Sequence, residues 1–201
     1  MVLSKKGLVS IIINYLNGSQ FIREALDSVY SQTYQEWEII LLDNGSNDDI
    51  LKIIKSYDDR IKYFRNENTV PLAEARNMAL GKTSGEYIAF LDSDDIWLPK
   101  KIELQLLSFS KETIGAVYTN FVSFNNDETW LGYSENSMPS GNIYEDILFN
   151  DFICFSSLMI SSNIIEEEKI LFDPILSYVE DEDFITRISR VKKFGYVSEI
   201  L

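Results

Sequence analysis

The chain has 201 residues, a length that suits a single domain. Hydrophobic residues make up 45% of the sequence, which predicts a folded core and argues against a disordered chain. The formal net charge is −14, which argues against binding to a nucleic-acid backbone and provides no basic anchor for an anionic membrane surface.

The histidine and cysteine content limits the catalytic mechanisms that the chain can use. Histidine is absent, which excludes catalytic triads and zinc sites that depend on imidazole. Proton transfer near neutral pH therefore falls to a carboxylate, a lysine, a tyrosine or the single cysteine, Cys154. One cysteine excludes an internal disulfide, and no apolar run reaches the length of a membrane span. We therefore expect a cytosolic chain, at most peripheral to the inner face of the membrane.

Strands and helices are predicted to alternate through residue 109. Apolar, β-branched runs predict buried strands, and apolar residues at helical spacing predict amphipathic helices. Ser19 is the predicted cap of the first helix. This order predicts parallel strands joined by right-handed crossovers in an α/β fold. The predicted strands are 9–13, 38–42, 61–64 and 87–91, and the predicted helices are 21–29, 50–57, 72–80 and 102–109.

The rest of the chain is less regular. Composition predicts strands at 116–124 and 155–160, with a polar loop or hairpin at 125–140 between them. Short helices are predicted at 143–149 and 164–169. A last helix opens at Glu180, and 194–197 begins a final strand.

Polar residues follow three of the predicted strands directly. They are the loop at 14–19, the segment 43–49, and the acids Asp92, Asp94 and Asp95. Open α/β sheets bind their ligands at the carboxyl ends of their strands, so these side chains are candidates for one site. Carboxylates this close repel one another unless a cation screens them, and oxygen ligands suit Mg²⁺ or Mn²⁺. The alternative is a solvated acidic turn that caps the next helix.

A second acidic cluster opens the last helix at 180–183, and the basic residues of that helix lie near its other end. Taken alone, this order favours simple stabilisation of the helix dipole.

Together, these segments resemble the family 2 glycosyltransferases, which have the GT-A fold. The resemblance covers nearly the whole chain and implies a mixed, mostly parallel sheet flanked by helices, with a Rossmann-like N-terminal half. It also implies one domain, in which 1–95 binds the nucleotide-sugar and 96–201 forms the acceptor side, expected to continue past Leu201. The matching blocks are 9–17, 31–34 with 38–46, 75–77 with 85–88 and 91–95, and Glu180-Asp181 followed by Arg187.

The resemblance implies a metal-dependent, inverting transfer of a sugar from a nucleotide-diphospho-sugar, expected to be a UDP-sugar. The acceptor would be a hydroxyl of a glycan, lipid-linked or protein-linked molecule in surface polysaccharide or glycan synthesis. Mn²⁺ or Mg²⁺ would bind at Asp94 and Asp95, Asp181 would act as the base, and Glu180 would orient it or contact the acceptor. The residues implied at the donor nucleotide are Asn14, Leu16, Asp43, Asn44, Arg76, Asp92 and Ser93.

Within that donor site, the resemblance assigns the base to Asp43 and Asn44, and the phosphate or base to Arg76. A surface salt bridge is the alternative for Arg76. Trp130, Tyr133 and the segment 154–157 are candidates for lining the sugar site, with core packing as the alternative.

Two other functions stay open. A nucleotidyltransferase would need a glycine-rich, basic loop after the first strand, but 14–20 contains one glycine and no lysine or arginine. A sugar-nucleotide-binding module without turnover is the other alternative.

Overall fold

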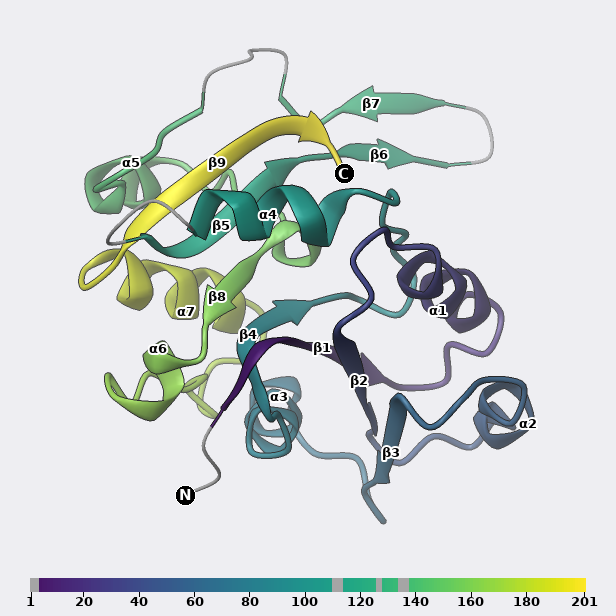
Figure 1. Cartoon of the computed structure of the whole chain (residues 1–201). Helices are drawn as coiled ribbons and strands as arrows, with labels where there is room; N and C mark the ends of the chain where they lie inside the picture. The colour runs from purple at the N-terminus through teal and green to yellow at the C-terminus, as the bar shows by residue number, and fades with distance from the viewer. Residues whose placement is uncertain (1–3, 110–113, 126–127, 134–137) are drawn as a thin grey trace.

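A seven-stranded sheet forms the centre of the computed structural model, which describes residues 4–109, 114–125, 128–133 and 138–201 (Figure 1). The strand order is β3-β2-β1-β4-β8-β5-β9. The strands are β1 Lys5–Tyr15, β2 Trp37–Asp43, β3 Ile61–Arg65, β4 Gly85–Phe90, β5 Ile114–Asn120, β8 Met159–Ser161 and β9 Lys193–Ile200.

The sheet is mixed and mostly parallel, as predicted. β1 pairs in parallel with β2 and β4, β2 pairs in parallel with β3, and β5 pairs in parallel with β9. β8 runs antiparallel to both β4 and β5 and therefore joins the two parallel groups. The carboxyl ends of β1, β2 and β4 consequently lie at the same edge of the sheet.

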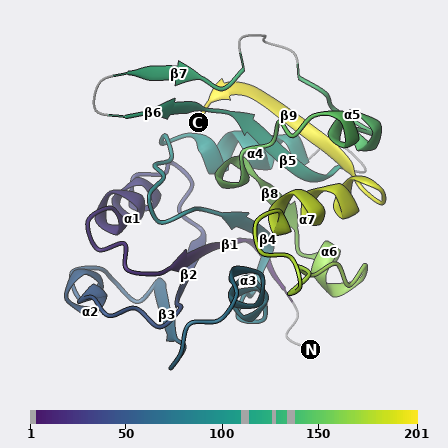
Figure 2. The same cartoon turned by 180° about the vertical axis from the view of Figure 1, so that it is seen from behind.

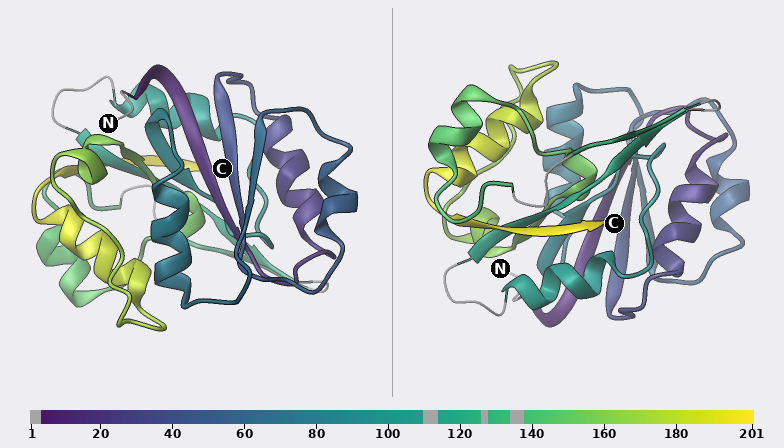
Figure 3. Two further views of the ribbon diagram at one scale, coloured as in Figure 1. Left: turned by 90° about the horizontal axis from the view of Figure 1, so that it is seen from below. Right: turned by 90° about the horizontal axis from the view of Figure 1, so that it is seen from above.

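Helices cover both faces of the sheet (Figures 2 and 3). Side chains alternate across β1, so that Ile11 and Ile13 pack with α1 and α4, whereas Ile12 packs with α3 and α7. No described helix is both long enough and apolar enough to cross a membrane. The helices are α1 Ile22–Tyr30, α2 Ile50–Ile54, α3 Leu72–Leu80, α4 Lys101–Phe109, α5 Tyr144–Phe149, α6 Asn163–Glu166 and α7 Glu180–Ser189.

The predicted strand at 116–124 is broken in two. β5 ends at Asn120, whose side-chain Oδ1 accepts hydrogen bonds from the backbone N–H groups of Phe121 (2.8 Å) and Tyr133 (3.1 Å). The chain then leaves the sheet and forms an antiparallel hairpin of β6 (Val122–Phe124) and β7 (Thr129–Leu131). Residues 126–127 and 134–137 of the predicted loop lie outside the described residues.

Three smaller predictions were also wrong. Ser19 does not cap α1, because the helix begins after Phe21, which is its N-cap residue. The backbone N–H of Ser19 instead donates to the Asp48 carboxylate (3.0 Å). Helix α2 ends at Ile54 rather than at residue 57. The segment Phe155–Ser157 forms a 3-10 helix, η1, so that only the residues after it pair as β8.

Candidate active site

The acids that follow β4 lie on a tight turn at the edge of a cavity. The backbone N–H of Asp95 donates to the carbonyl oxygen of Asp92 (3.1 Å), and the N–H of Asp92 donates to Ser156 Oγ (3.0 Å). Asp94 is exposed, and Asp95 is partly buried. Both line a cavity of about 700 Å³. The turn therefore presents its carboxylates to an open space rather than only to a helix end.

The same cavity is bounded by segments that are far apart in the sequence. Aromatic rings form its apolar wall, and the η1 segment supplies polar groups. The rings are those of Phe21 just before α1, Trp97 after β4, and Phe121 and Phe124 at the β6 end of the hairpin. Of the predicted sugar-site residues, Cys154, Ser156 and Ser157 line the cavity. Tyr133 instead packs edge-on against Tyr118 and Phe121 in the core. Trp130 is half-exposed on β7.

The acids that follow β4 interact electrostatically with Asp181 at the start of α7. Partial burial raises the pKa of Asp92 to about 6. The nearby Arg76 opposes this rise, whereas Asp95, Asp94 and Asp181 add to it. Asp181, in the first turn of α7, is thus one of the acids whose charge acts on Asp92.

Arg76 of α3 joins the two acidic segments directly. Its Nη1 lies 2.9 Å from Glu180 Oε1 and 4.0 Å from Asp181 Oδ2, and its Nη2 lies 3.7 Å from Asp92 Oδ1. Arg76 is only 3% exposed, so the alternative of a surface salt bridge was wrong. Glu180 is 4% exposed, whereas the Asp181 side chain is about one-third exposed. Of the two predicted catalytic acids, Asp181 is the more accessible to solvent.

The loop after β2 is anchored by Asp43, which is wholly buried. One carboxylate oxygen accepts hydrogen bonds from Tyr63 Oη and Arg65 Nη1 (both 2.6 Å), and the other accepts from the Ser46 N–H (2.8 Å). Burial alone would raise the pKa of Asp43, but the hydrogen bonds from Tyr63 and Ser46 and the charge of Arg65 outweigh it and hold the pKa below its ordinary value.

Asn44 continues this anchoring. Its Oδ1 accepts from Asn66 Nδ2 (3.0 Å) and the Val70 N–H (3.1 Å), and its Nδ2 donates to the Val70 carbonyl oxygen (2.8 Å). Gly45 follows at a φ of 84°, where a Cβ would meet the Thr69 backbone nitrogen at 2.9 Å. Asn44 thus shapes the loop, and its contact with a nucleotide base stays a prediction, as does that of Asp43.

The loop after β1 lies next to the acidic turn. A Cβ on Gly18 would come within 3.2 Å of Ser93 Oγ, so these two loops are in close contact. Asn14, at the end of β1, has a buried Oδ1 that no group in the described residues donates to. Leu16 is half-exposed beside it. A buried carbonyl oxygen without a donor is a natural partner for a ligand N–H or O–H group.

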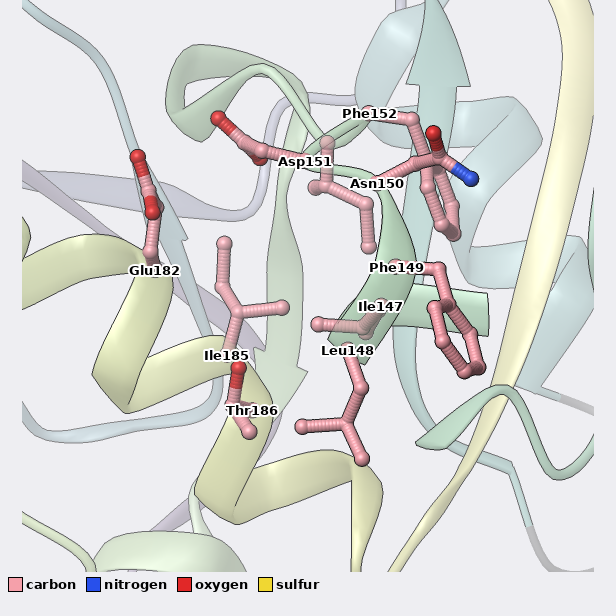
Figure 4. Close-up of a pocket in the computed structure, with 10 residues that line it drawn as sticks. Ile147, Leu148, Phe149, Asn150, Asp151, Phe152, Glu182, Ile185 and Thr186 are labelled. Carbon is pink, nitrogen blue, oxygen red and sulfur yellow. The ribbon is translucent and has the colours of Figure 1, made fainter. Parts of the chain in front are cut away.

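Sequence reasoning missed Asp151 and the pocket that it shares with Glu182 (Figure 4). This pocket, of about 200 Å³, lies between α5, the segment that follows it and α7. Burial raises the pKa of Asp151, and the charge of Asp181 raises it further. Burial likewise raises the pKa of Glu182, with added contributions from Asp151 and Asp181. Asp151 is an isolated acid in the sequence, so no motif pointed to it.

Comparison with solved structures identifies the fold. The chain superposes on S. aureus TarS with a TM-score of 0.78 at 20% identity, covering 95% of this chain and 35% of TarS. It superposes on the Pyrobaculum calidifontis mannosyltransferase PcManGT, solved with GDP-Man and Mn²⁺, with a TM-score of 0.71 at 18% identity, covering 96% and 54%. The fold is therefore the GT-A fold, which confirms the predicted fold class.

Comparison of sequences identifies the family. Residues 10–166 match the model of glycosyl transferase family 2, and the chain belongs to this family. Over 121 residues it is 42% identical to the Escherichia coli UDP-Glc:alpha-D-GlcNAc-diphosphoundecaprenol beta-1,3-glucosyltransferase WfgD, covering 60% of this chain and 48% of WfgD. The chain thus spans less than half of this relative and about a third of TarS.

Proposed function

We propose that this chain carries the catalytic domain of a metal-dependent, inverting glycosyltransferase. The observation that supports this most strongly is the convergence of Asp92 and Asp181 on Arg76, because it unites the acids after β4 with the first turn of α7. Donor binding and proton removal are thereby assigned to neighbouring parts of one site. We propose that 1–95 supplies most of the donor side and 96–201 most of the acceptor side.

The donor that we propose is a UDP-sugar. WfgD is named for UDP-Glc, and TarS has been solved with UDP-GlcNAc in a form that this chain matches with a TM-score of 0.72. In this proposal the unpaired Oδ1 of Asn14 accepts a hydrogen bond from the nucleotide, and Leu16 flanks it. Asp43 and Asn44 shape the pocket for the base, and Asp92 and Ser93 face the ribose.

The donor atoms available at the acidic turn fit Mg²⁺ or Mn²⁺. Among the residues that the structure describes, no group of three or more acids or cysteines is arranged to hold a metal ion. Asp94 and Asp95 nevertheless offer carboxylates at the cavity, and these metals are commonly held by one or two carboxylates together with substrate phosphates and water. When bound, such an ion stabilises the charge that develops on the departing diphosphate.

The proposed base is Asp181. Its carboxylate is partly exposed. Oδ1 accepts a hydrogen bond from the backbone N–H of Glu182 (3.0 Å), and Oδ2 lies 4.0 Å from the Arg76 guanidinium. It can therefore accept the proton of an acceptor hydroxyl as that oxygen attacks the anomeric carbon from the face opposite the diphosphate. A carboxylate suits this role in a chain that has no histidine.

The acceptor that we propose is a sugar hydroxyl of a diphosphate-linked lipid, in the synthesis of a surface polysaccharide. Support comes from WfgD, whose name specifies such an acceptor. An acceptor of this kind would bring the protein to the inner face of the membrane.

Two measurements separate this proposal from its alternatives. We expect UDP to raise the melting temperature more in the presence of Mn²⁺ than in its absence. We also expect release of UDP from UDP-glucose when a GlcNAc α-diphosphate with a short alkyl chain is added. Tight UDP binding without turnover would favour a binding module, and release of pyrophosphate from UTP and a sugar phosphate would favour a nucleotidyltransferase.

A further inference from the structure

Two adjacent residues of α3 hold the segment that leads into α7. Asn77 Oδ1 accepts from the backbone N–H of Phe172 (2.9 Å), and Asn77 Nδ2 donates to the Phe172 carbonyl oxygen (2.8 Å). Arg76 Nη1 donates to Glu180 Oε1 (2.9 Å) at the other end of the same segment. The helix α3 therefore brackets the chain between Phe172 and the first residue of α7.

The guanidinium of Arg76 is itself fixed by aromatic rings. It lies 4.1 Å from the ring centroid of Phe155 and 5.5 Å from that of Phe172, and Phe172 stacks on Phe184 of α7 with centroids 4.0 Å apart. A planar cation packed on ring faces has one strongly preferred orientation. Arg76 is thus a rigid point of attachment.

Further contacts near the start of α7 are the bond from Arg187 Nη2 to the Leu171 carbonyl oxygen (2.6 Å), the Arg187–Asp183 ion pair (2.6 Å) and the Phe172–Phe184 stack. The residue before the helix, Val179, makes no side-chain capping hydrogen bond. Ile175 and Tyr178, in the preceding loop, are 88% and 93% exposed. Of these contacts, the one between Arg76 and Glu180 acts on the first residue of α7, directly before Asp181, and it is completed by the bonds of Asn77 to Phe172.

We infer that Arg76 is a positioning residue that sets the separation between Asp181 and the acids after β4. This inference rests on the proposed function, because it takes Asp181 as the base. Glu180 accepts the hydrogen bond from Arg76 Nη1, whereas Asp181 Oδ2 lies 4.0 Å from that nitrogen. The Asp181 carboxylate therefore stays available to the acceptor. In this inference Arg76 acts through the carboxylates rather than on the donor phosphates, because its guanidinium is buried and paired with Glu180 and Asp92.

The test compares variants that separate positioning from donor binding. Arg76→Met alone would leave Glu180 as a buried, unpaired charge and could unfold the protein. The double variant Arg76→Met/Glu180→Gln removes both charges, and Arg76→Lys keeps one cation. Lys192→Met is the matched control, because it removes the Lys192–Glu168 ion pair (2.7 Å) just beyond the other end of α7.

For the double variant we expect kcat for sugar transfer to fall by about 100-fold, the scale of a 1 Å misplacement. The Kd for UDP with Mn²⁺ should change by less than about twofold, since donor contacts are kept, and Arg76→Lys should recover part of kcat. Amide hydrogen exchange of residues 172–185 should become faster than in wild type, while that of β1 and β2 should not. The Lys192→Met control should match wild type in all these measurements.

Two results would overturn the inference. One is a large loss of UDP affinity with unchanged hydrogen exchange at 172–185, which would make Arg76 a donor contact. The other is an unchanged kcat in the double variant. Failure of the proposed function gives a different pattern: wild type would turn over no donor, whereas hydrogen exchange at 172–185 would still respond to the double variant and would support the bracket.

Discussion

Replacement of Lys101 by methionine is expected to change how the stability of the protein depends on pH. Lys101, the first residue of α4, is completely buried, and its Nζ donates to Gln105 Oε1 (2.6 Å) and lies 4.1 Å from the Trp97 ring centroid. Burial lowers its pKa from the ordinary 10.5 to about 7. Because Trp97 lines the 700 Å³ cavity, this lysine lies directly behind the cavity wall.

The size of the effect follows from proton linkage. Between pH 7 and 10.5 the unfolded chain binds a proton at Lys101 that the folded chain does not, so folding stability rises with pH across this window. Each unit of pKa difference corresponds to about 1.36 kcal/mol. The contribution of Lys101 to the free energy of unfolding should therefore rise by about 2 kcal/mol between pH 7 and pH 9 and change little below pH 6.

The assay is guanidinium unfolding of wild type and Lys101→Met at pH 6, 7, 8 and 9. Between pH 7 and 9, the free energy of unfolding of wild type should rise by about 2 kcal/mol relative to that of Lys101→Met. The lost hydrogen bond to Gln105 adds only an offset that does not depend on pH. Lys100→Met, at an exposed neighbouring position, is the control and should run parallel to wild type. A difference between wild type and Lys101→Met that is flat from pH 6 to 9 would refute the reasoning.

Three further predictions concern the site and its scaffold. Gly45→Ala should lower the free energy of unfolding by about 1–3 kcal/mol in denaturant titrations, because its φ is 84° and the new Cβ would meet the Thr69 backbone; an unchanged midpoint would contradict this. Asp94→Asn should abolish the extra thermal shift that Mn²⁺ gives to UDP while leaving the melting temperature without ligand within a few degrees, and an intact Mn²⁺ effect would remove Asp94 from the metal site. Burial would raise the pKa of Glu38, but hydrogen bonds, that from Lys62 foremost, hold it below 4.5. Glu38→Gln should therefore be less stable than wild type at pH 7, and this difference should shrink as pH falls below about 4; a difference that widened in acid would show the opposite linkage.

Local sequence patterns were sufficient to predict the first half of the fold. The β-branched run at 9–13 became the centre of β1, and the predicted helix at 72–80 has the bounds of α3. The polar residues that end these strands also lie at one edge of the sheet, because parallel strands with short crossovers leave few other arrangements. Non-local pairing explains what was missed. β8 contributes only three residues and depends on β4 and β5, which are distant in the sequence.

The sequence predicted the acids of the candidate site, but it did not predict that Arg76 pairs with Glu180 between them. Arg76 and Glu180 are 104 positions apart, and no local rule pairs them. A signal was nevertheless present, since Ala73, Arg76 and Leu80 recur at helical spacing on one face of α3. An arginine on the buried face of a helix needs acidic partners, and the acids at 180–181 were the available ones. No comparable spacing of residues around Asp151 indicated that it lies near the site.

The central claim is that Asp181 removes the acceptor proton in a site shared with the acids after β4. The most direct measurement is the rate of sugar transfer by Asp181→Asn at saturating UDP-glucose and Mn²⁺, with the GlcNAc α-diphosphate acceptor. We predict a rate at least about 100-fold below that of wild type, the scale of a lost general base, with the affinity for UDP unchanged. A rate close to that of wild type would contradict the account.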